Sequence, residues 1–303
     1  MKENICVSVL ILAYNAEKYI EELLESIKKQ TYQNIEIIIS DDASKDDTIS
    51  VAQAWKYENW HCLETMVIRS SKENQGVVKN ANLGLELCNG KYIKIIAADD
   101  KLTPICIEEM VKTCEDKEYL LLLGRMQSFY RGNDLQDIPV NFEFYEMNAE
   151  EQYKHLLKVN ECAAPTALYR AEFLKEINGF DENYPAMEDY PLWLKVTGCG
   201  VKIPLLDRTV VYYRRNDNSV TSTTGVRMVG VNYFKSYKKF FYNKKIKDMV
   251  KYHYYREICR ECKEFLYKDL VLLFGNHRDS RATLLLTRIF YGKIADCNQN
   301  GDR

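Results

Sequence analysis

A nearly unbroken apolar run close to the N-terminus, CVSVLILA at Cys6–Ala13, constrains the fold more than any other stretch of this sequence. A strand with one face in solvent alternates apolar and polar residues, whereas a continuously apolar strand must be covered on both faces. Apolar residues then recur at helical spacing from Tyr19 to Ile27, and Asn15 is placed to cap that helix. A second apolar strand pattern follows at Ile35–Ile39. We therefore predict a sheet with helices on both faces, which is an α/β fold.

The alternation of strand and helix patterns continues along the first 130 residues. The next predicted elements are strands at Met66–Arg69 and Tyr92–Ile96 and helices at Asp46–Trp55 and Gly76–Cys88. Such alternation is typical of a mostly parallel sheet, because each crossover helix returns the chain to the start of the next strand. The later predicted elements are strands at Ala163–Tyr169 and Thr209–Tyr213, helices at Ala171–Ile177 and Glu188–Val196, an irregular connection with a short helix at 131–160, and helices after Val229.

Polar clusters directly follow three of the predicted strands. They are Tyr14 and Asn15 after the first strand, Asp41 and Asp42 after the second, and Asp99 and Asp100 after the fourth. The carboxyl ends of parallel strands meet at one edge of a sheet, and ligands of such sheets bind there. The sequence therefore predicts one site, built from all three clusters, at this edge.

Each acidic cluster has two interpretations from the residues alone. Asp99 and Asp100 suit a hard divalent cation, Mn²⁺ or Mg²⁺, or they cap a helix expected to begin near Pro104. Asp41 and Asp42 either accept a hydrogen bond from the edge of a nucleotide base or form a turn and a helix cap.

A third acidic pair, Glu188 and Asp189, opens a predicted amphipathic helix. An acid at this position either interacts with the helix dipole or acts as the general base for an acceptor hydroxyl.

Several classes of protein lack support in this sequence. No GxxxxGK[ST] phosphate loop or GxGxxG fingerprint follows the first strand, and no GxSxG elbow is present. The apolar runs are too short to cross a bilayer, and the N-terminus shows no signal-peptide pattern. The ten cysteines are scattered, as is typical of reduced thiols, so we expect a cytoplasmic protein.

Charge is distributed unevenly along the chain. Residues 226–303 carry 17 Lys and Arg against 8 Asp and Glu, a net charge of +9, whereas the 303-residue chain carries −2 in total. We therefore expect two regions, an acidic body at 1–225 and a basic, aromatic-rich helical region at 226–303. The basic region either contacts an anionic membrane surface or packs as an ordinary helical subdomain on the body or on a second subunit.

In this order, the clusters resemble the inverting family 2 glycosyltransferases of the GT-A fold, over roughly residues 5–222. The matching segments are Ser8–Asn15, Asp41–Thr48, Asn74–Gly76 with Lys79 and Asn82, Ala97–Asp100, Gly179–Glu182 with Glu188 and Asp189, and Tyr213–Thr221. The sequence departs from the family pattern where Leu12 replaces Pro, where Ala97 replaces the first acid of the metal motif, and where Asn216 replaces His.

The resemblance implies a GT-A (Rossmann-like), mostly parallel central sheet flanked by helices, with a C-terminal helical extension. It implies nucleotide-binding roles for Ala13, Tyr14, Asn15, Asp41, Asp42, Lys79, Asp99, Arg214 and Ser219. It further implies Mn²⁺ or Mg²⁺ on Asp99 and Asp100, and catalysis by Asp189 with Glu188.

The activity that the resemblance implies is metal-dependent, inverting transfer of a sugar from a nucleotide diphosphate sugar, most simply a UDP-sugar. The acceptor would be a hydroxyl of a glycan or lipid-linked molecule in bacterial surface polysaccharide biosynthesis, at the inner face of the cell membrane if the basic region binds lipid. Two other classes remain open: a catalytically silent nucleotide-sugar binding module and a nucleotidylyltransferase. The second requires a Gly-rich, Arg-bearing loop after the first strand, and Ala13–Lys18 has none. No nucleic-acid partner is expected.

Overall fold

The structure is a computed structural model that describes residues 5–59, 65–130, 134–215, 230–274 and 280–291. The chain divides into two compact units, Met1–Arg215 and Asn216–Arg303. The boundary predicted between residues 225 and 226 lies outside the described residues.

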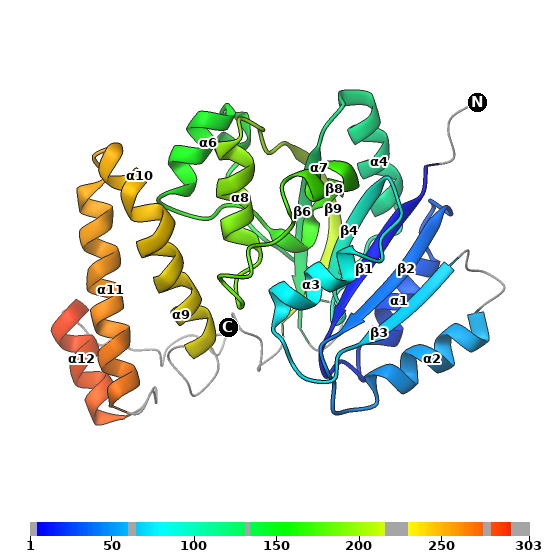
Figure 1. The fold of residues 1–303 in the computed structure, drawn as a ribbon, viewed down its shortest axis with the longest axis horizontal. Helices are drawn as coiled ribbons and strands as arrows, with labels where there is room; N and C mark the ends of the chain where they lie inside the picture. The colour runs from blue at the N-terminus through cyan, green and yellow to red at the C-terminus, as the bar shows by residue number, and fades with distance from the viewer. Residues whose placement is uncertain (1–4, 60–64, 131–133, 216–229, 275–279, 292–303) are drawn as a thin grey trace. The chain divides into compact units, whose positions relative to one another are not determined.

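The first unit is organised around one sheet, in which the described strands follow the order β3-β2-β1-β4-β8-β6-β9-β5, with β7 paired to β6 (Figure 1). The strands are β1 (Val7–Ala13), β2 (Ile35–Asp41), β3 (Thr65–Ser70), β4 (Tyr92–Ala97), β5 (Lys101–Leu102), β6 (Leu121–Phe129), β7 (Gln136–Asp137), β8 (Leu168–Arg170) and β9 (Leu205–Arg214). The helices of this unit are α1 (Ile20–Lys28), α2 (Thr48–Asn59), α3 (Val77–Leu85), α4 (Cys106–Lys117), α5 (Phe142–Glu146), α6 (Ala149–Leu156), α7 (Ala171–Glu176) and α8 (Asp189–Gly198).

The parallel arrangement predicted for the first four strands is confirmed. Strand β1 lies between β2 and β4, and all its pairings are parallel. The register sets Ala13 opposite Asp41 and Leu12 opposite Ala97, so the three polar clusters do begin side by side at one edge of the sheet. Beyond β4 the sheet is mixed, because β8 runs antiparallel to both β4 and β6.

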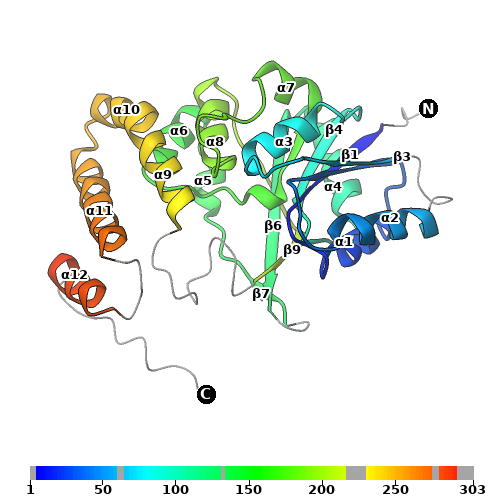
Figure 2. The same ribbon diagram turned by 60° about the horizontal axis from the view of Figure 1, so that its bottom comes forward.

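Both faces of β1 are covered, as its apolar run requires. Val9 and Ile11 belong to a buried cluster with residues of α1, α2 and α4. On the other face, a Cβ placed on Gly84 of α3 would lie 2.4 Å from Leu10 Cδ1, so a larger residue here would require Leu10 to shift. Figure 2 shows α1 and α2 on one side of the parallel strands and α3 on the other.

Two predictions along the later part of this unit were wrong. Residues 163–169 do not form one strand: Ala164–Thr166 is a 3₁₀ turn, and β8 begins only at Leu168. Pro165 has no N–H to donate to a sheet, and a helical first turn tolerates its absence. The irregular connection at 131–160 contains two helices, α5 and α6, of which α6 begins with a full capping box between Asn148 and Glu151.

The described secondary-structure elements of the second unit are all helical, as predicted. Its elements are α9 (Val231–Phe240), a π-turn at Phe241–Lys245, α10 (Ile246–Lys251), α11 (Tyr255–Leu273) and α12 (Arg281–Tyr291). The ring of Phe265 packs 5.1 Å from that of Phe241 and 6.0 Å from that of Phe234, which joins α11 to α9 and the π-turn. Across the described helices of both units, none is long and apolar enough to cross a membrane.

Candidate functional site

The turns that follow β1 and β2 are hydrogen-bonded to each other. Asn15 has a φ of 50°, a left-handed conformation that Asn tolerates well. Its Oδ1 accepts from the Lys45 backbone N at 2.8 Å, and its own N donates to Ser44 Oγ at 2.8 Å. The predicted capping role of Asn15 is therefore wrong: α1 begins at Ile20 without a side-chain cap, and Asn15 holds the two turns together instead.

Asp41 and Asp42 are both buried at the end of β2, but their partners differ. Asp41 accepts from two hydroxyls, that of Ser44 and that of Ser70, the latter at 2.6 Å, and from the Ser44 backbone N at 3.1 Å. Asp42 accepts from the backbone N–H groups of Gln75 and Gly76, at 2.7 and 2.9 Å. Hydroxyls rotate to suit a new partner and backbone amides do not, so Asp41, with two hydroxyls among its donors, is the more adaptable of the two acceptors.

Exposed side chains suitable for a ligand lie beside this pair. Ala13 is buried and its carbonyl accepts from the Asp42 backbone N at 2.9 Å, whereas the next residue, Tyr14, is 52% exposed. Lys79 lies on the first turn of α3 and is also exposed. This edge of the sheet thus offers an aromatic ring, that of Tyr14, and a cation, that of Lys79, near the buried carboxylate of Asp41.

Asp100 is 1% exposed and is held by the far end of β9. Its Oδ1 accepts from the Arg214 backbone N at 2.8 Å, while its Oδ2 is buried with no hydrogen-bond partner among the described residues. Burial and the neighbouring Asp99 carboxylate raise the pKa of Asp100 to about 8. Asp100 does not cap a helix, because α4 begins at Cys106 with Ile105 as its N-terminal neighbour. The helix-cap interpretation of this pair was therefore wrong.

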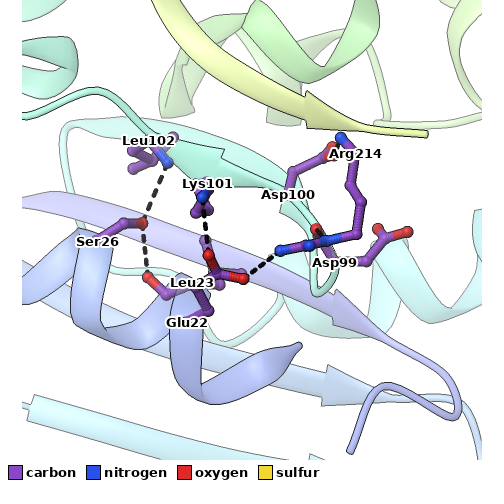
Figure 3. A network of polar contacts seen from close by, with 8 residues as sticks. All are labelled: Glu22, Leu23, Ser26, Asp99, Asp100, Lys101, Leu102 and Arg214. Carbon is purple, nitrogen blue, oxygen red and sulfur yellow. Dashed lines mark hydrogen bonds and ion pairs between the residues drawn. The ribbon is translucent and has the colours of Figure 1, made fainter. Parts of the chain in front are cut away.

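Arg214 is held beside the acidic pair by a carbonyl, a carboxylate and two aromatic rings; Figure 3 shows it next to both acids and Glu22. Its Nε donates to the Asp99 backbone carbonyl at 2.8 Å, and its Nη2 forms an ion pair with Glu22 of α1. The guanidinium carbon lies 4.7 Å from the ring centre of Tyr19 and 4.4 Å from that of Phe129. Stacking on two rings restricts the plane of the guanidinium group.

Glu188 and Asp189 stand at the start of α8 and are partly buried. Asp189 Oδ2 accepts from Asn160 Nδ2 at 3.1 Å. Burial and the neighbouring Asp189 charge raise the pKa of Glu188 to about 7, and burial also raises the pKa of Asp189. A carboxyl with a raised pKa is better matched to accepting a proton near neutral pH.

The segment that leads to this pair is fastened to α3 by Asn82. Asn82 Oδ1 accepts from the Phe180 backbone N at 3.0 Å, and its Nδ2 donates to the Phe180 carbonyl at 2.9 Å and to Glu182 at 3.1 Å. Gly179 approaches the same side chain, since a Cβ there would lie 2.8 Å from Asn82 Oδ1. The sequence contained both elements, but nothing in their spacing indicated that they bind each other.

A divalent cation would find two adjacent carboxylates here, those of Asp99 and Asp100. In the described part of the chain, no group of three or more Asp, Glu, His or Cys side chains is arranged to hold a metal ion. The unpartnered Oδ2 of Asp100 nevertheless fits a cation, because a buried carboxylate oxygen without a donor is costly. Water and ligand phosphates commonly complete such a coordination shell. The predicted contacts of Ser219 and the substitution at Asn216 lie outside the described residues.

Comparisons with known proteins agree with this architecture. The family model described as "Glycosyl transferase family 2" matches residues 8–177. An uncharacterized glycosyltransferase of Haemophilus influenzae is 32% identical over 71% of this chain and 67% of its own length. The Escherichia coli UDP-Glc:alpha-D-GlcNAc-diphosphoundecaprenol beta-1,3-glucosyltransferase WfaP is 28% identical over 71% of this chain and 80% of its own.

Solved structures show the same fold at lower sequence identity. S. aureus TarS 1–349 in complex with UDP-GlcNAc aligns with a TM-score of 0.64 and 19% identity, over 94% of this chain and 80% of that TarS fragment. The mannosyltransferase PcManGT from Pyrobaculum calidifontis, in complex with GDP-Man and Mn²⁺, aligns with a TM-score of 0.53 and 19% identity, over 78% of this chain and 65% of its own. The fold, together with the acidic pairs at the carboxyl ends of β2 and β4, defines an α/β glycosyltransferase of the GT-A type. The chain belongs to glycosyl transferase family 2.

Proposed function

We propose that this glycosyltransferase moves a sugar from a UDP-sugar to a hydroxyl of a glycan or lipid-linked acceptor, with inversion at the anomeric carbon, in bacterial surface polysaccharide biosynthesis. The observation that carries this proposal is the acidic edge of the sheet, where Asp41 ends β2 and Asp100 follows β4, the two strands that flank β1, and Arg214 at the end of β9 donates to Asp100. The names of WfaP, which uses UDP-Glc, and of TarS bound to UDP-GlcNAc support a UDP-sugar donor.

The nucleotide is assigned to the turns after β1 and β2. Tyr14 presents an exposed ring on which a base can stack, and Asp41 is an acceptor suited to the N3–H of uracil. The hydroxyls of Ser44 and Ser70, which now donate to Asp41, can turn away when the base arrives. The other residues proposed to bind the nucleotide and its phosphates are Ala13, Asn15, Asp42, Lys79, Asp99, Arg214 and Ser219.

The diphosphate is assigned to the acidic pair and to Arg214. Asp99 and Asp100 would hold Mn²⁺ or Mg²⁺, which when bound stabilises negative charge on the departing nucleoside diphosphate. The donor complexes of PcManGT with Mn²⁺ support such a metal for this chain. Arg214 is fixed beside the pair, so its guanidinium is placed to bind phosphate oxygens.

The acceptor is activated by Asp189 in this proposal. The hydroxyl oxygen attacks the anomeric carbon from the face opposite the diphosphate, its proton passes to the Asp189 carboxylate, and the bond to the diphosphate breaks. Asn160 orients Asp189 by donating at 3.1 Å, and burial raises the pKa of Asp189 and of Glu188 beside it. A positioned base is typically worth about 10²–10⁴ in rate.

The second unit is proposed to meet the membrane that carries a lipid-linked acceptor. Exposed apolar side chains occur on both of its last described helices, Leu266 and Leu273 on α11 and Leu285 and Ile289 on α12. Together with the net charge of +9 of residues 226–303, they suit an anionic lipid surface. Salt-sensitive flotation with anionic but not neutral liposomes would support this contact, whereas a homodimer in ultracentrifugation would assign the surface to a second copy.

The donor assignment can be tested by thermal unfolding with each common nucleotide sugar, with and without Mn²⁺. A ligand that binds only the folded state raises the unfolding midpoint by mass action. We expect UDP-sugars with Mn²⁺ to raise it and GDP-sugars to do so less. If no nucleotide sugar shifts the midpoint, the donor assignment is wrong. Tight UDP binding without turnover on any acceptor would favour the silent binding module.

A further inference from the structure

One face of α1 is bound to the segment that follows the acidic pair. Ser26 Oγ accepts from the Leu102 backbone N at 3.1 Å, and Glu22, one helical turn earlier, forms an ion pair with Lys101 at 2.8 Å. Residues four apart share one helix face, so Glu22 and Ser26 act together on this segment. Figure 3 shows both side chains directed at the same turn.

Glu22 also reaches Arg214, which lies 192 residues away in the sequence. The same carboxylate thus joins two cations that flank Asp99 and Asp100, with Lys101 on one oxygen and Arg214 on the other. Burial alone would raise the pKa of Glu22, but the hydrogen bonds from Lys101 and Arg214 lower it below its usual value. Glu22 is therefore a carboxylate at neutral pH.

The contacts of Arg214 leave it able to bind a ligand. In the described part of the chain, one guanidinium N–H goes to the Asp99 carbonyl and one to Glu22, which leaves three of its five N–H donors. The rings of Tyr19 and Phe129 fix the plane in which those donors point. A guanidinium that is already oriented loses less entropy when it binds phosphate.

The contribution of Glu22 to folding is expected to be small. Its side chain is 47% exposed, and half-exposed ion pairs contribute about 0–1 kcal/mol to stability. The Glu22 carboxylate joins α1, β5 and β9 at the edge of the sheet and does not support the core. Its role is therefore better explained by the position it gives to Lys101 and Arg214.

We propose that Glu22 is a positioning residue for the donor diphosphate, acting through Arg214. It keeps the guanidinium group beside the backbone of Asp99, with its remaining donors turned to the place where the phosphates bind. The inference rests on the proposed function, because it needs a diphosphate at Asp99 and Asp100.

Binding of UDP and of uridine, each measured with Mn²⁺ by calorimetry or NMR titration, tests this role without relying on turnover. We expect Glu22→Gln to weaken UDP binding roughly fivefold and to leave uridine binding unchanged, because uridine lacks the phosphates that Arg214 would hold. Glu21→Gln removes the same charge from the adjacent exposed position of α1, and we expect it to change neither affinity. Glu22→Asp should recover part of the loss.

A double-mutant cycle connects the effect to Arg214. Arg214→Lys keeps the backbone N–H that holds Asp100 but loses the planar donors, so adding Glu22→Gln to it should cost little more. Unchanged or tighter UDP binding by Glu22→Gln would overturn the inference, as would an equal loss for uridine or full additivity with Arg214→Lys. If the wild-type protein binds neither UDP nor uridine, the proposed function fails instead.

Discussion

The side chain of Asn82 offers a direct test of how the candidate base is held in place. It makes three hydrogen bonds to the turn at 180–182, two of them to the backbone of Phe180. A hydrogen bond contributes about 0.5–1.5 kcal/mol net, and the one to Glu182 is exposed and worth less. We therefore expect Asn82→Ala to lower the free energy of unfolding by about 2 kcal/mol, measured by urea denaturation.

The same substitution should affect activity more than stability. The released turn leads within a few residues to Glu188 and Asp189, and a misplacement of about 1 Å at a reacting group can cost about 10²-fold in rate. We expect kcat/KM to fall at least tenfold. Asn183→Ala, next to this turn and bonded to Asp181 within the described part of the chain, is the matched control and should change stability by less than about 0.5 kcal/mol. If Asn82→Ala behaves like this control in both assays, the turn is not held by Asn82.

Two further predictions concern pH. Burial would raise the pKa of Glu36, but bonds from Ser8 and from the backbone of Asn89 and Gly90 lower it, so its stabilisation is present above the usual carboxyl pKa and is lost as pH falls through the folded-state value. Glu36→Gln should therefore cost about 2 kcal/mol at pH 7 and less at pH 4 in urea unfolding, and an equal cost at both pH values would contradict this. The raised pKa of Glu188 has the opposite effect on the pH dependence of stability, because a folded state that holds the proton more tightly loses stability as pH rises through about 7. Glu188→Gln should remove a loss of about 2 kcal/mol between pH 5.5 and 8, and a wild-type profile that is flat over this range would refute the shift.

The parallel half of the sheet and the location of the site could be predicted from the sequence because both leave local patterns. Continuous apolar runs mark strands covered on both faces, and acid pairs directly after them mark the strand ends. The registry of Ala13 with Asp41 and of Leu12 with Ala97 then follows from parallel pairing.

The contacts that complete the site leave no such pattern. Asn82 meets Phe180 across 98 residues and Glu22 meets Arg214 across 192, so their partnership exists only in the folded chain. Strand β6 was missed for a related reason: its apolar start at Leu121 runs into the polar stretch that ends at Phe129, and pairing with β9 rather than local propensity makes it a strand.

The hydrogen-bond partners of Asp41 and Asp42 distinguish two acids that the sequence does not distinguish. As adjacent acids after one strand they are equivalent in the sequence, yet Asp41 accepts from two hydroxyls and the Ser44 amide of its own turn, and Asp42 accepts from backbone amides of the segment before α3. Only the structure distinguishes an acceptor that is free to change partner from one that holds a loop.

Turnover by Asp189→Asn, compared with the wild type, tests the central claim most directly. The measurement is release of UDP from the UDP-sugar that gives the largest thermal shift, with Mn²⁺ and an acceptor, alongside the affinity for UDP. We predict that the variant binds UDP as the wild type does and turns over about 10²–10⁴-fold more slowly, because it loses the base and keeps the nucleotide site. Equal turnover by the two proteins would show that Asp189 is not the base and would contradict the account.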